Sequence, residues 1–384
     1  MKRILSLCLC ICLVLGIASC SRQRDFLLIS PHEGQYVREE NEGVIVVGSY
    51  DAMVSALVYL VTNSETKGQI RASNYSGTVT EDLANAVYNV AKRTPMGSYA
   101  VDYITYDCIQ VVSYYEITVD INYSKTPEEI SRIITTRGQT ALLTRLGQAM
   151  ERYDPSLCLY VYSYEQTDLA ECVRNYYETH PGTLQALPEI QAAFYPNEQS
   201  ECILEIRLRY PEEPEEMRRR QQSVREEAES AAEYVHFRDN QTEQMQLLYL
   251  YLSERFEYEA RTTAMPVYSA LCEGIASSTG FARAMQILCE ELEIECHTVK
   301  GIYNGGDWSW NIVRLDGQYY HIDVMRDVIN DAGALNLNLD SEMSAYSWET
   351  SEYPACAIRP DDWPDISTEP ELTETTRGIG MDLE

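Results

Sequence analysis

Basic residues, histidines and closely spaced cysteine pairs are scarce in this sequence of 384 residues. Its 30 lysines and arginines stand against 60 aspartates and glutamates, which gives a formal net charge of −30. A surface this acidic repels nucleic acid phosphates and anionic lipid headgroups. We therefore expect no nucleic acid partner and no binding to membranes through charge attraction, and the charge is typical of a surface that keeps a protein soluble.

Metal-binding and phosphate-binding motifs are also missing. The five histidines are scattered, without an HExxH pattern or a helical pair, so the sequence predicts no metal site. Gly301, Gly305 and Gly306 do not have the spacing of a glycine-rich phosphate loop. These patterns predict a protein that needs no cofactor.

The cysteines include no CxxC pair of the metal-binding kind. Four of the twelve lie within the first twenty residues, which leaves eight. An even number in an exported protein permits disulfide bonds, whereas cysteines within apolar runs are equally compatible with buried free thiols. Their spacing assigns no connectivity. The eight are Cys108, Cys158, Cys172, Cys202, Cys272, Cys289, Cys296 and Cys356.

The first residues are typical of an export signal. Lys2 and Arg3 precede the apolar run Ile4–Gly16, which is too short for a membrane span of about 20 residues. The Ile-Ala-Ser-Cys20 sequence that follows resembles a lipobox, in which the cysteine receives diacylglycerol and becomes the mature N-terminus. We expect removal of residues 1–19 and anchoring through acyl chains such as palmitate on the outer face of a bacterial cell membrane. The alternative is an ordinary signal peptide with an incidental cysteine.

An internal repeat with a period of about 87 residues occupies residues 45–210. Matching positions include Leu83 and Leu169, Val87 and Val173, Pro95 and Pro181, and Ile121 and Leu208. Each copy, at about 45–130 and 136–210, is predicted to run helix, strand, helix and then one or two strands. Two copies are too few for a solenoid, so the sequence predicts a duplicated α/β module, with Leu83 and Leu169 at equivalent buried positions.

Periodicity gives the expected elements of both copies. The expected helices are Met53–Val61, Glu81–Lys92, Leu142–Met150 and Asp168–Glu178, and the expected strands are Ile70–Ala72, Glu116–Asn122, Cys158–Tyr162 and Cys202–Arg209.

Three charged or polar segments flank the expected domains. Residues 20–44 are expected to tether the chain to the membrane, and residues 211–232 to form an exposed, charged helical connector. The arginines at 218–220 are flanked by glutamates, which is more typical of a solvated helix face than of a basic binding patch. Residues 359–384 form an acidic tail that is expected to be disordered.

Four motifs follow one another in the last third of the chain. They are Gly280-Phe-Ala-Arg-Ala-Met, Glu293-Ile-Glu-Cys, Trp308-Ser-Trp-Asn and Gln318-Tyr-Tyr-His-Ile-Asp323. In order and spacing they resemble the transglutaminase-like family of papain-type enzymes, in the form common on bacterial surfaces. The resemblance implies a papain-like domain at residues 233–358 and, with the duplicated module, an α+β fold.

The resemblance also implies where catalytic residues would lie. The family uses a cysteine nucleophile at a helix N-terminus, a histidine base and an aspartate that orients the histidine. Carried over by position, the cysteine falls on Ser278, the histidine on Trp308 and the aspartate on Asp323. Indole has an N–H donor but accepts no proton at neutral pH, so this triad is degenerate and the sequence predicts a pseudoenzyme.

The vacated site is a candidate ligand groove. We expect Ser278, Trp308, Trp310 and Asn311 to surround it. The Ser278 hydroxyl is expected to cap the helix by accepting a backbone N–H of the first turn. Trp308 is expected to fill the volume of the histidine, and its size favours plugging the groove over lining it.

A relocated active site is a second interpretation. Cys272-Glu-Gly resembles the start of the nucleophile motif but lies six residues too early. His321 and Asp323 are two residues apart and would share one face of a strand. A thiol peptidase or amide-transfer enzyme built on Cys272, His321 and Asp323 therefore stays open, as does a structural spacer with no ligand. The leading hypothesis is a membrane-anchored binding or scaffolding protein for a peptide, a cell-wall fragment or a protein.

Overall fold

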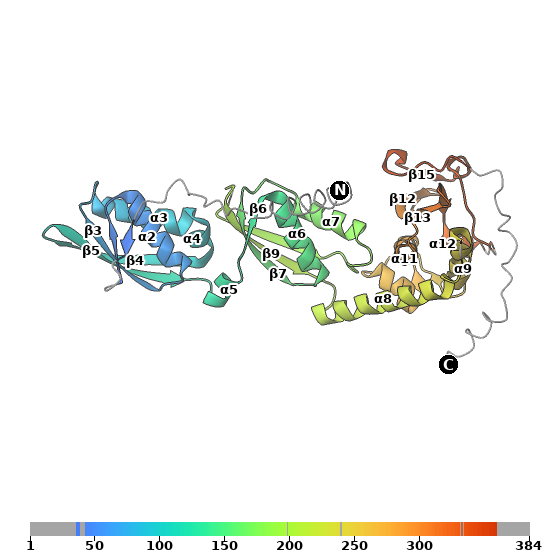
Figure 1. Cartoon of the computed structure of the whole chain (residues 1–384), viewed down its shortest axis with the longest axis horizontal. Coiled ribbons are helices and arrows are strands. Elements are labelled where there is room, and N and C mark those ends of the chain that lie inside the picture. The colour runs from blue at the N-terminus through green and yellow to red at the C-terminus, as the bar shows by residue number, and fades with distance from the viewer. Residues whose placement is uncertain are drawn as a thin grey trace, which may run out of the picture. The chain divides into compact units, whose positions relative to one another are not determined.

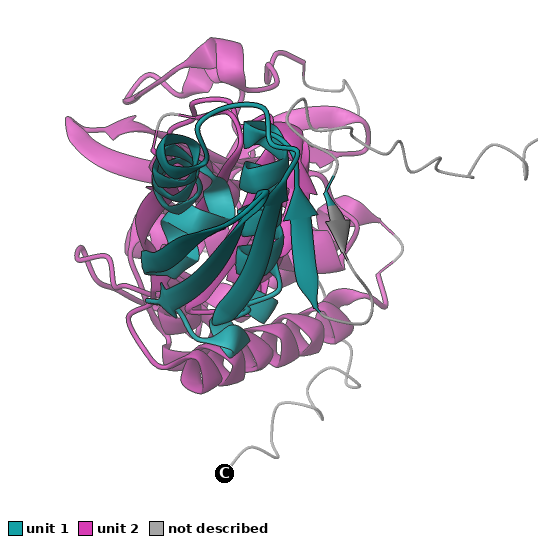
Figure 2. Cartoon of the chain, turned by 90° about the vertical axis from the view of Figure 1, so that its left-hand side faces the viewer, with its two compact units in different colours: residues 1–131 teal, residues 132–384 magenta. Residues whose placement is uncertain are grey.

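The computed structural model describes residues 36–38, 43–197, 199–238, 240–330, 332 and 334–358. The expected signal peptide, the expected lipidation site Cys20, most of the expected tether and the acidic tail lie outside these residues. The chain divides into two compact units, residues 1–131 and 132–384 (Figure 2). Helices and mixed sheets in both units confirm the predicted α+β class.

The first unit contains one five-stranded sheet with helices packed against it (Figure 1). Its elements are β1 (Val37–Arg38), β2 (Val44–Val47), α2 (Tyr50–Thr62), β3 (Lys67–Ser73), α3 (Val79–Arg93), α4 (Pro95–Ala100), β4 (Val101–Val111), β5 (Tyr114–Tyr123) and α5 (Pro127–Ser131). The strand order is β1-β2-β3-β5-β4. Strand β5 buries Ile117, Val119 and Ile121, because alternate residues point to the same face of a strand.

The second unit begins with a module of the same topology. Its elements are β6 (Ile134–Arg137), α6 (Gly138–Glu151), β7 (Ser156–Tyr162), α7 (Leu169–Thr179), β8 (Glu189–Tyr195) and β9 (Cys202–Arg209). The order β6-β7-β9-β8 repeats β2-β3-β5-β4, and in both sheets the first pair is parallel and the other two are antiparallel.

The two modules are therefore a structural duplication. Leu83 is fully buried and Leu169 is 6% exposed, each within the hydrophobic core of its own module. The leading strands β2 and β6 were not among the elements expected from periodicity, because each has only four residues. Helix α3 has 15 residues and α7 has 11, so the second helix is one turn shorter in the second copy.

The rest of the second unit contains a four-stranded antiparallel sheet of order β14-β13-β12-β15. Its elements are α8 (Pro214–Val235), α9 (Gln241–Ser253), β10 (Glu257–Tyr258), α10 (Pro266–Glu273), β11 (Ile275–Ala276), α11 (Ser278–Glu291), β12 (Cys296–Tyr303), β13 (Gly306–Leu315), β14 (Gln318–Ile322), α12 (Val324–Ile329), η1 (Asp340–Glu342), β15 (Tyr346–Trp348) and η2 (Thr350–Glu352). Helix α11 packs against β12 and β13.

Helix α8 is a correction to the expected exposed connector. It packs against α9, α10 and α11, and five of its side chains are buried. These are Met217, Val224, Ala228, Ala231 and Val235. They recur at helical spacing on one face, whereas the expectation rested on the low apolar content of the whole segment.

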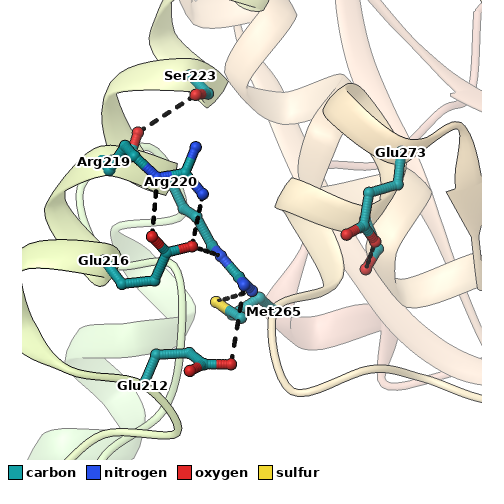
Figure 3. Close-up of polar contacts among 8 residues, drawn as sticks. Glu212, Glu216, Arg219, Arg220, Ser223, Met265 and Glu273 are labelled. Carbon is teal, nitrogen blue, oxygen red and sulfur yellow. Dashed lines mark hydrogen bonds and ion pairs between the residues drawn. The ribbon is translucent and has the colours of Figure 1, made fainter.

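Charged residues of α8 also hold the start of α10. The Arg220 guanidinium contacts Glu216 at 2.6 Å and Glu212 at 3.8 Å, and its Nη1 lies 3.6 Å from the Met265 sulfur (Figure 3). The same guanidinium stacks on the ring of Tyr268, 5.0 Å from its centroid. Arg219 and Arg220 of the arginine run therefore form salt bridges with nearby glutamates, and Arg220 is half-buried.

Candidate functional site

The N-terminus of α11 marks the position where the family places its nucleophile. Ser277, not Ser278, is the cap: its backbone is extended and its hydroxyl accepts the N–H of Gly280 at 3.2 Å. The helix thus begins one residue earlier than expected, which corrects the assignment of the cap to Ser278. Gly280 permits close packing, since a Cβ there would lie 2.8 Å from the carbonyl oxygen of Pro266.

Ser278 is the first helical residue and is buried. Its hydroxyl accepts the backbone N–H of Ser309 at 3.4 Å. Among the described residues it has no hydrogen bond to Trp308 or Asp323. The serine hydroxyl therefore has no base beside it that would remove its proton.

Trp308 occupies the histidine position and donates its indole N–H to Asp323 Oδ2 at 2.7 Å. The ring is half-buried and lies beside Tyr258 and Tyr303, with centroids 5.8 and 5.5 Å away. A catalytic histidine would direct an N–H to this carboxylate in the same way. The indole thus donates to this carboxylate but cannot accept a proton.

Asp323 caps α12 and accepts three hydrogen bonds. Oδ1 accepts the Arg326 backbone N–H at 3.0 Å, and Oδ2 also accepts the Tyr346 hydroxyl at 2.6 Å. Burial raises the pKa of the carboxyl, and the hydrogen bonds from Tyr346, Arg326 and Trp308 oppose that rise. The aspartate acts as a structural acceptor that joins β13, β15 and α12.

The alternative triad of Cys272, His321 and Asp323 is not assembled by hydrogen bonds in the described part of the chain. His321 is fully buried, its Nδ1 accepts the Trp310 indole N–H at 2.9 Å, and its Nε2 lies 2.8 Å from Asp340 Oδ1. Burial, with Glu227 and Glu273 nearby, raises the pKa of the Cys272 thiol to about 11. Little thiolate would exist at neutral pH, and both nitrogens of His321 already have other partners.

His321, Asp340 and Cys356 have the residue types of a metal site, with ligand atoms within 4.8 Å of one another. The hydrogen bonds argue for a different role. Because indole can only donate, Nδ1 of His321 must be the acceptor, and the ring proton lies on Nε2, which donates to Asp340. To bind a metal, Nε2 would have to lose its proton while Nδ1, which accepts the Trp310 N–H, also has no proton. The donor set therefore fits a buried hydrogen-bond network better than a metal centre.

Two residues expected at the groove are buried inside the domain instead. Trp310 is 1% exposed and packs with Val299 and Met343. Asn311 is also buried, and its side-chain amide donates to the Ala282 carbonyl at 2.8 Å. Both lie on β13, where they join the sheet to the structure on its two sides. Of the four residues expected around the groove, only Trp308 is partly exposed.

A cleft of about 830 Å³ lies elsewhere in the second unit, between α7, the α11 N-terminus and β12. Thr279 and Arg283 line it from one face of α11, Thr298 and Lys300 from alternate positions of β12, and Glu178 from α7. This cleft was not predicted from the sequence, because its walls come from the second α/β module and from the transglutaminase-like domain, which are far apart in the sequence. The one feature of the sequence that could have indicated the cleft is Arg283, a cation within a largely apolar helix.

The eight cysteines in the described residues are free thiols, so the structure contains no disulfide among them. Cys202, Cys289 and Cys356 are buried. Burial raises the pKa of Cys356 to about 12 and also raises the pKa of Cys202. Cys202 and Cys356 are therefore packing residues with little thiolate character.

The motifs, the cap on α11 and the antiparallel sheet agree with a comparison against known families. The sequence model of the transglutaminase-like superfamily matches residues 228–324. The chain contains a transglutaminase-like domain. The match starts within α8 and ends just after Asp323, so it includes the three triad positions and part of the helix that was expected to be a connector.

A solved structure described as "Crystal structure of a TGase" is similar to part of the chain, with 11% identity and a TM-score of 0.26. The similarity covers 44% of this chain and 50% of that chain, so the match spans half the length of that protein. No curated protein matches the sequence.

Proposed function

We propose that the transglutaminase-like domain is a pseudoenzyme that binds or scaffolds a partner at a bacterial cell envelope. The observation that supports this most strongly is the hydrogen bond from Trp308 to Asp323. It stabilises an indole where the chemistry needs an imidazole, so the aspartate has a partner and the nucleophile position has no proton acceptor. A ligand would be a peptide, a cell-wall fragment or a protein, held without being cleaved or joined.

The proposed location rests on the N-terminal sequence. Export followed by diacylation of Cys20 would place the mature protein on the outer face of the cell membrane, because two acyl chains anchor stably where one does not. Among the described residues, no helix is long and apolar enough to cross a membrane. In this proposal the lipid holds the binding modules at the envelope.

Restoring the missing groups tests the pseudoenzyme proposal. Ser278→Cys alone should recover little reactivity toward a small thiol-directed probe, because no base lies beside the new thiol. Adding Trp308→His supplies an imidazole whose N–H would donate to Asp323 as the indole does, and labelling should rise above that of either single variant. Cys272→Ser in each background separates labelling at position 278 from labelling of the native thiol.

Selective labelling of Cys272 in the unmodified protein, abolished by Cys272→Ser, would instead support the thiol-enzyme alternative. The ligand-free spacer makes a different prediction. A ligand that binds only the folded state raises the melting temperature, so a spacer would show no thermal shift with any peptide or cell-wall fragment.

A further inference from the structure

Arg283 is a buried cation without an acidic partner. Its side chain is 5% exposed, and none of the ion pairs among the described residues includes it. Nη2 donates to the Tyr177 carbonyl at 2.9 Å, and the guanidinium lies 4.0 Å from the centroid of the Tyr177 ring. Nε is buried without any hydrogen-bond partner. A buried charge is normally compensated by an opposite charge, so this arginine is incompletely satisfied by the protein.

The other two cations that line the same cleft already have partners. Lys300 forms an ion pair with Glu178, and Arg209 pairs with Glu189 at 3.5 Å. Burial lowers the pKa of Arg283, with Tyr177 and Glu178 partly opposing that effect. Of the three cations that line the cleft, Arg283 is therefore the one without an ion pair among the described residues. Its planar guanidinium is the group best suited to hold a carboxylate with two parallel hydrogen bonds.

The walls of the cleft suit a short peptide. Its volume of about 830 Å³ lies within the range of small-ligand sites. Apolar area comes from Tyr177, Tyr210 and Pro266, and hydroxyl groups come from Thr279 and Thr298. Three glutamates also line the cleft, at positions 178, 189 and 352, and they would repel a phosphate dianion more strongly than a single carboxylate.

We infer that this cleft binds a short peptide through one of its carboxylates, with Arg283 as the group that recognises it. The inference builds on the proposed binding role and gives it a ligand class and a site distinct from the vacated triad. The carboxylate would complete the hydrogen bonding of Arg283, and the apolar walls would receive small side chains. The carboxylate could be a peptide C-terminus or an acidic side chain, and the two are separable by probe.

Binding to the unmodified mature protein is the first test. Calorimetry or ligand-observed NMR with trialanine, trialanine amide and an Ala-Glu-Ala peptide amide separates the sources. Loss of a charged hydrogen-bond partner should weaken binding about tenfold or more, so the amide should bind at least that much more weakly than the free acid. Recovery with the glutamate peptide would assign the site to a side-chain carboxylate. Equal binding of the acid and both amides, or stronger competition by inorganic phosphate, would overturn the inference.

Arginine variants locate the site. Arg283→Lys keeps the charge but loses the planar fork, and Arg283→Gln loses both, so binding of the acid should weaken progressively. Arg314→Gln, at an exposed arginine of the same domain outside the cleft, is the matched control and should bind normally. Circular dichroism and melting curves identify a variant that fails to fold, and the comparison of acid with amide on the unmodified protein still decides the case.

These outcomes are separable from those that bear on the pseudoenzyme proposal. Turnover that depends on Ser278, accompanied by Arg283-dependent preference for the acid, would contradict the pseudoenzyme and leave the carboxylate site standing. An inactive protein whose binding of the acid is unchanged by Arg283→Gln would contradict the carboxylate site alone.

Discussion

At the residue scale, the proposed pseudoenzyme rests on one side chain. Trp308 gives Asp323 the N–H that a histidine would give, at 2.7 Å. The sequence was sufficient to predict that Ser278, Trp308 and Asp323 stand at the triad positions implied by the motif spacing. It did not show that the indole and the carboxylate would be hydrogen-bonded, because that depends on the packing of β13 against β15 and α12.

Removing this hydrogen bond should destabilise the domain. Trp308→Phe keeps most of the apolar area but leaves Asp323 without one of its three donors. We expect a loss of about 1–3 kcal/mol in the free energy of unfolding, measured by urea titration. Trp348→Phe, at a half-buried tryptophan with no indole hydrogen bond among the described contacts, is the control and should cost less. Equal losses would show that the bond to Asp323 contributes little.

Stability should also depend on pH through His321. Burial lowers the pKa of this histidine below its ordinary value of 6.5, although Asp340 opposes part of the shift. In the interval below 6.5 the unfolded chain therefore binds a proton that the folded chain rejects, so stability should fall as the pH falls through this interval. Melting temperatures between pH 7.5 and about 5 should show this slope.

His321→Gln should reduce that slope, because the titrating group is gone. His297→Gln removes a half-buried histidine of the same sheet and leaves His321 in place, so it should retain the slope. An unchanged slope in His321→Gln would show that other groups are responsible for the pH dependence.

At the scale of the elements, the repeat was predictable and the leading strands were not. Amphipathic helices and alternating strands leave a period in the sequence, which is why α2, α3, α6, α7, β5 and β9 match the expected ranges closely. Strands β2 and β6 are four residues long and pair in parallel with the next strand, so they leave little period to detect. Helix α8 was misread because its buried face has only five residues, two of them alanines, within a long and highly charged segment.

The repeat predicts matched effects in the two modules. Leu83→Ala and Leu169→Ala each remove a buried leucine from a helix that packs on the sheet of its own module. Each should cost about 2–5 kcal/mol, provided that the cavity does not collapse. Leu187→Ala, at a leucine that is 44% exposed, is the control and should cost much less. A negligible effect at either buried leucine, measured by urea unfolding, would contradict its place in the core.

Helix α8 should behave as part of the transglutaminase-like domain. Val224 is 1% exposed within the core that contains α9, α10 and α11. Val224→Asp buries an unpaired carboxylate and should abolish cooperative unfolding or lower the melting temperature sharply. Arg225→Asp places the same group on the exposed neighbouring position and should be tolerated. A tolerated Val224→Asp would restore the view of α8 as an exposed connector.

At the scale of the whole molecule, we propose that one chain combines a lipid anchor, two α/β modules and an inactive domain. The anchor is testable by itself. Cys20→Ala should move the protein out of the detergent phase or leave an unprocessed precursor, because the acyl acceptor is lost. Acylation of the Cys20→Ala protein, with full retention in the membrane, would contradict this assignment.

Turnover by the unmodified mature protein tests the central claim most directly. Purified protein would be incubated with a panel of peptide amides, with and without an amine acceptor, and hydrolysis and transfer would be measured by mass spectrometry. Ser278→Ala is the matched control, because among the described residues the Ser278 hydroxyl accepts the Ser309 N–H alone. We expect no product above background in either protein, since Trp308 provides no base. Turnover by the unmodified protein that disappears in Ser278→Ala would contradict it.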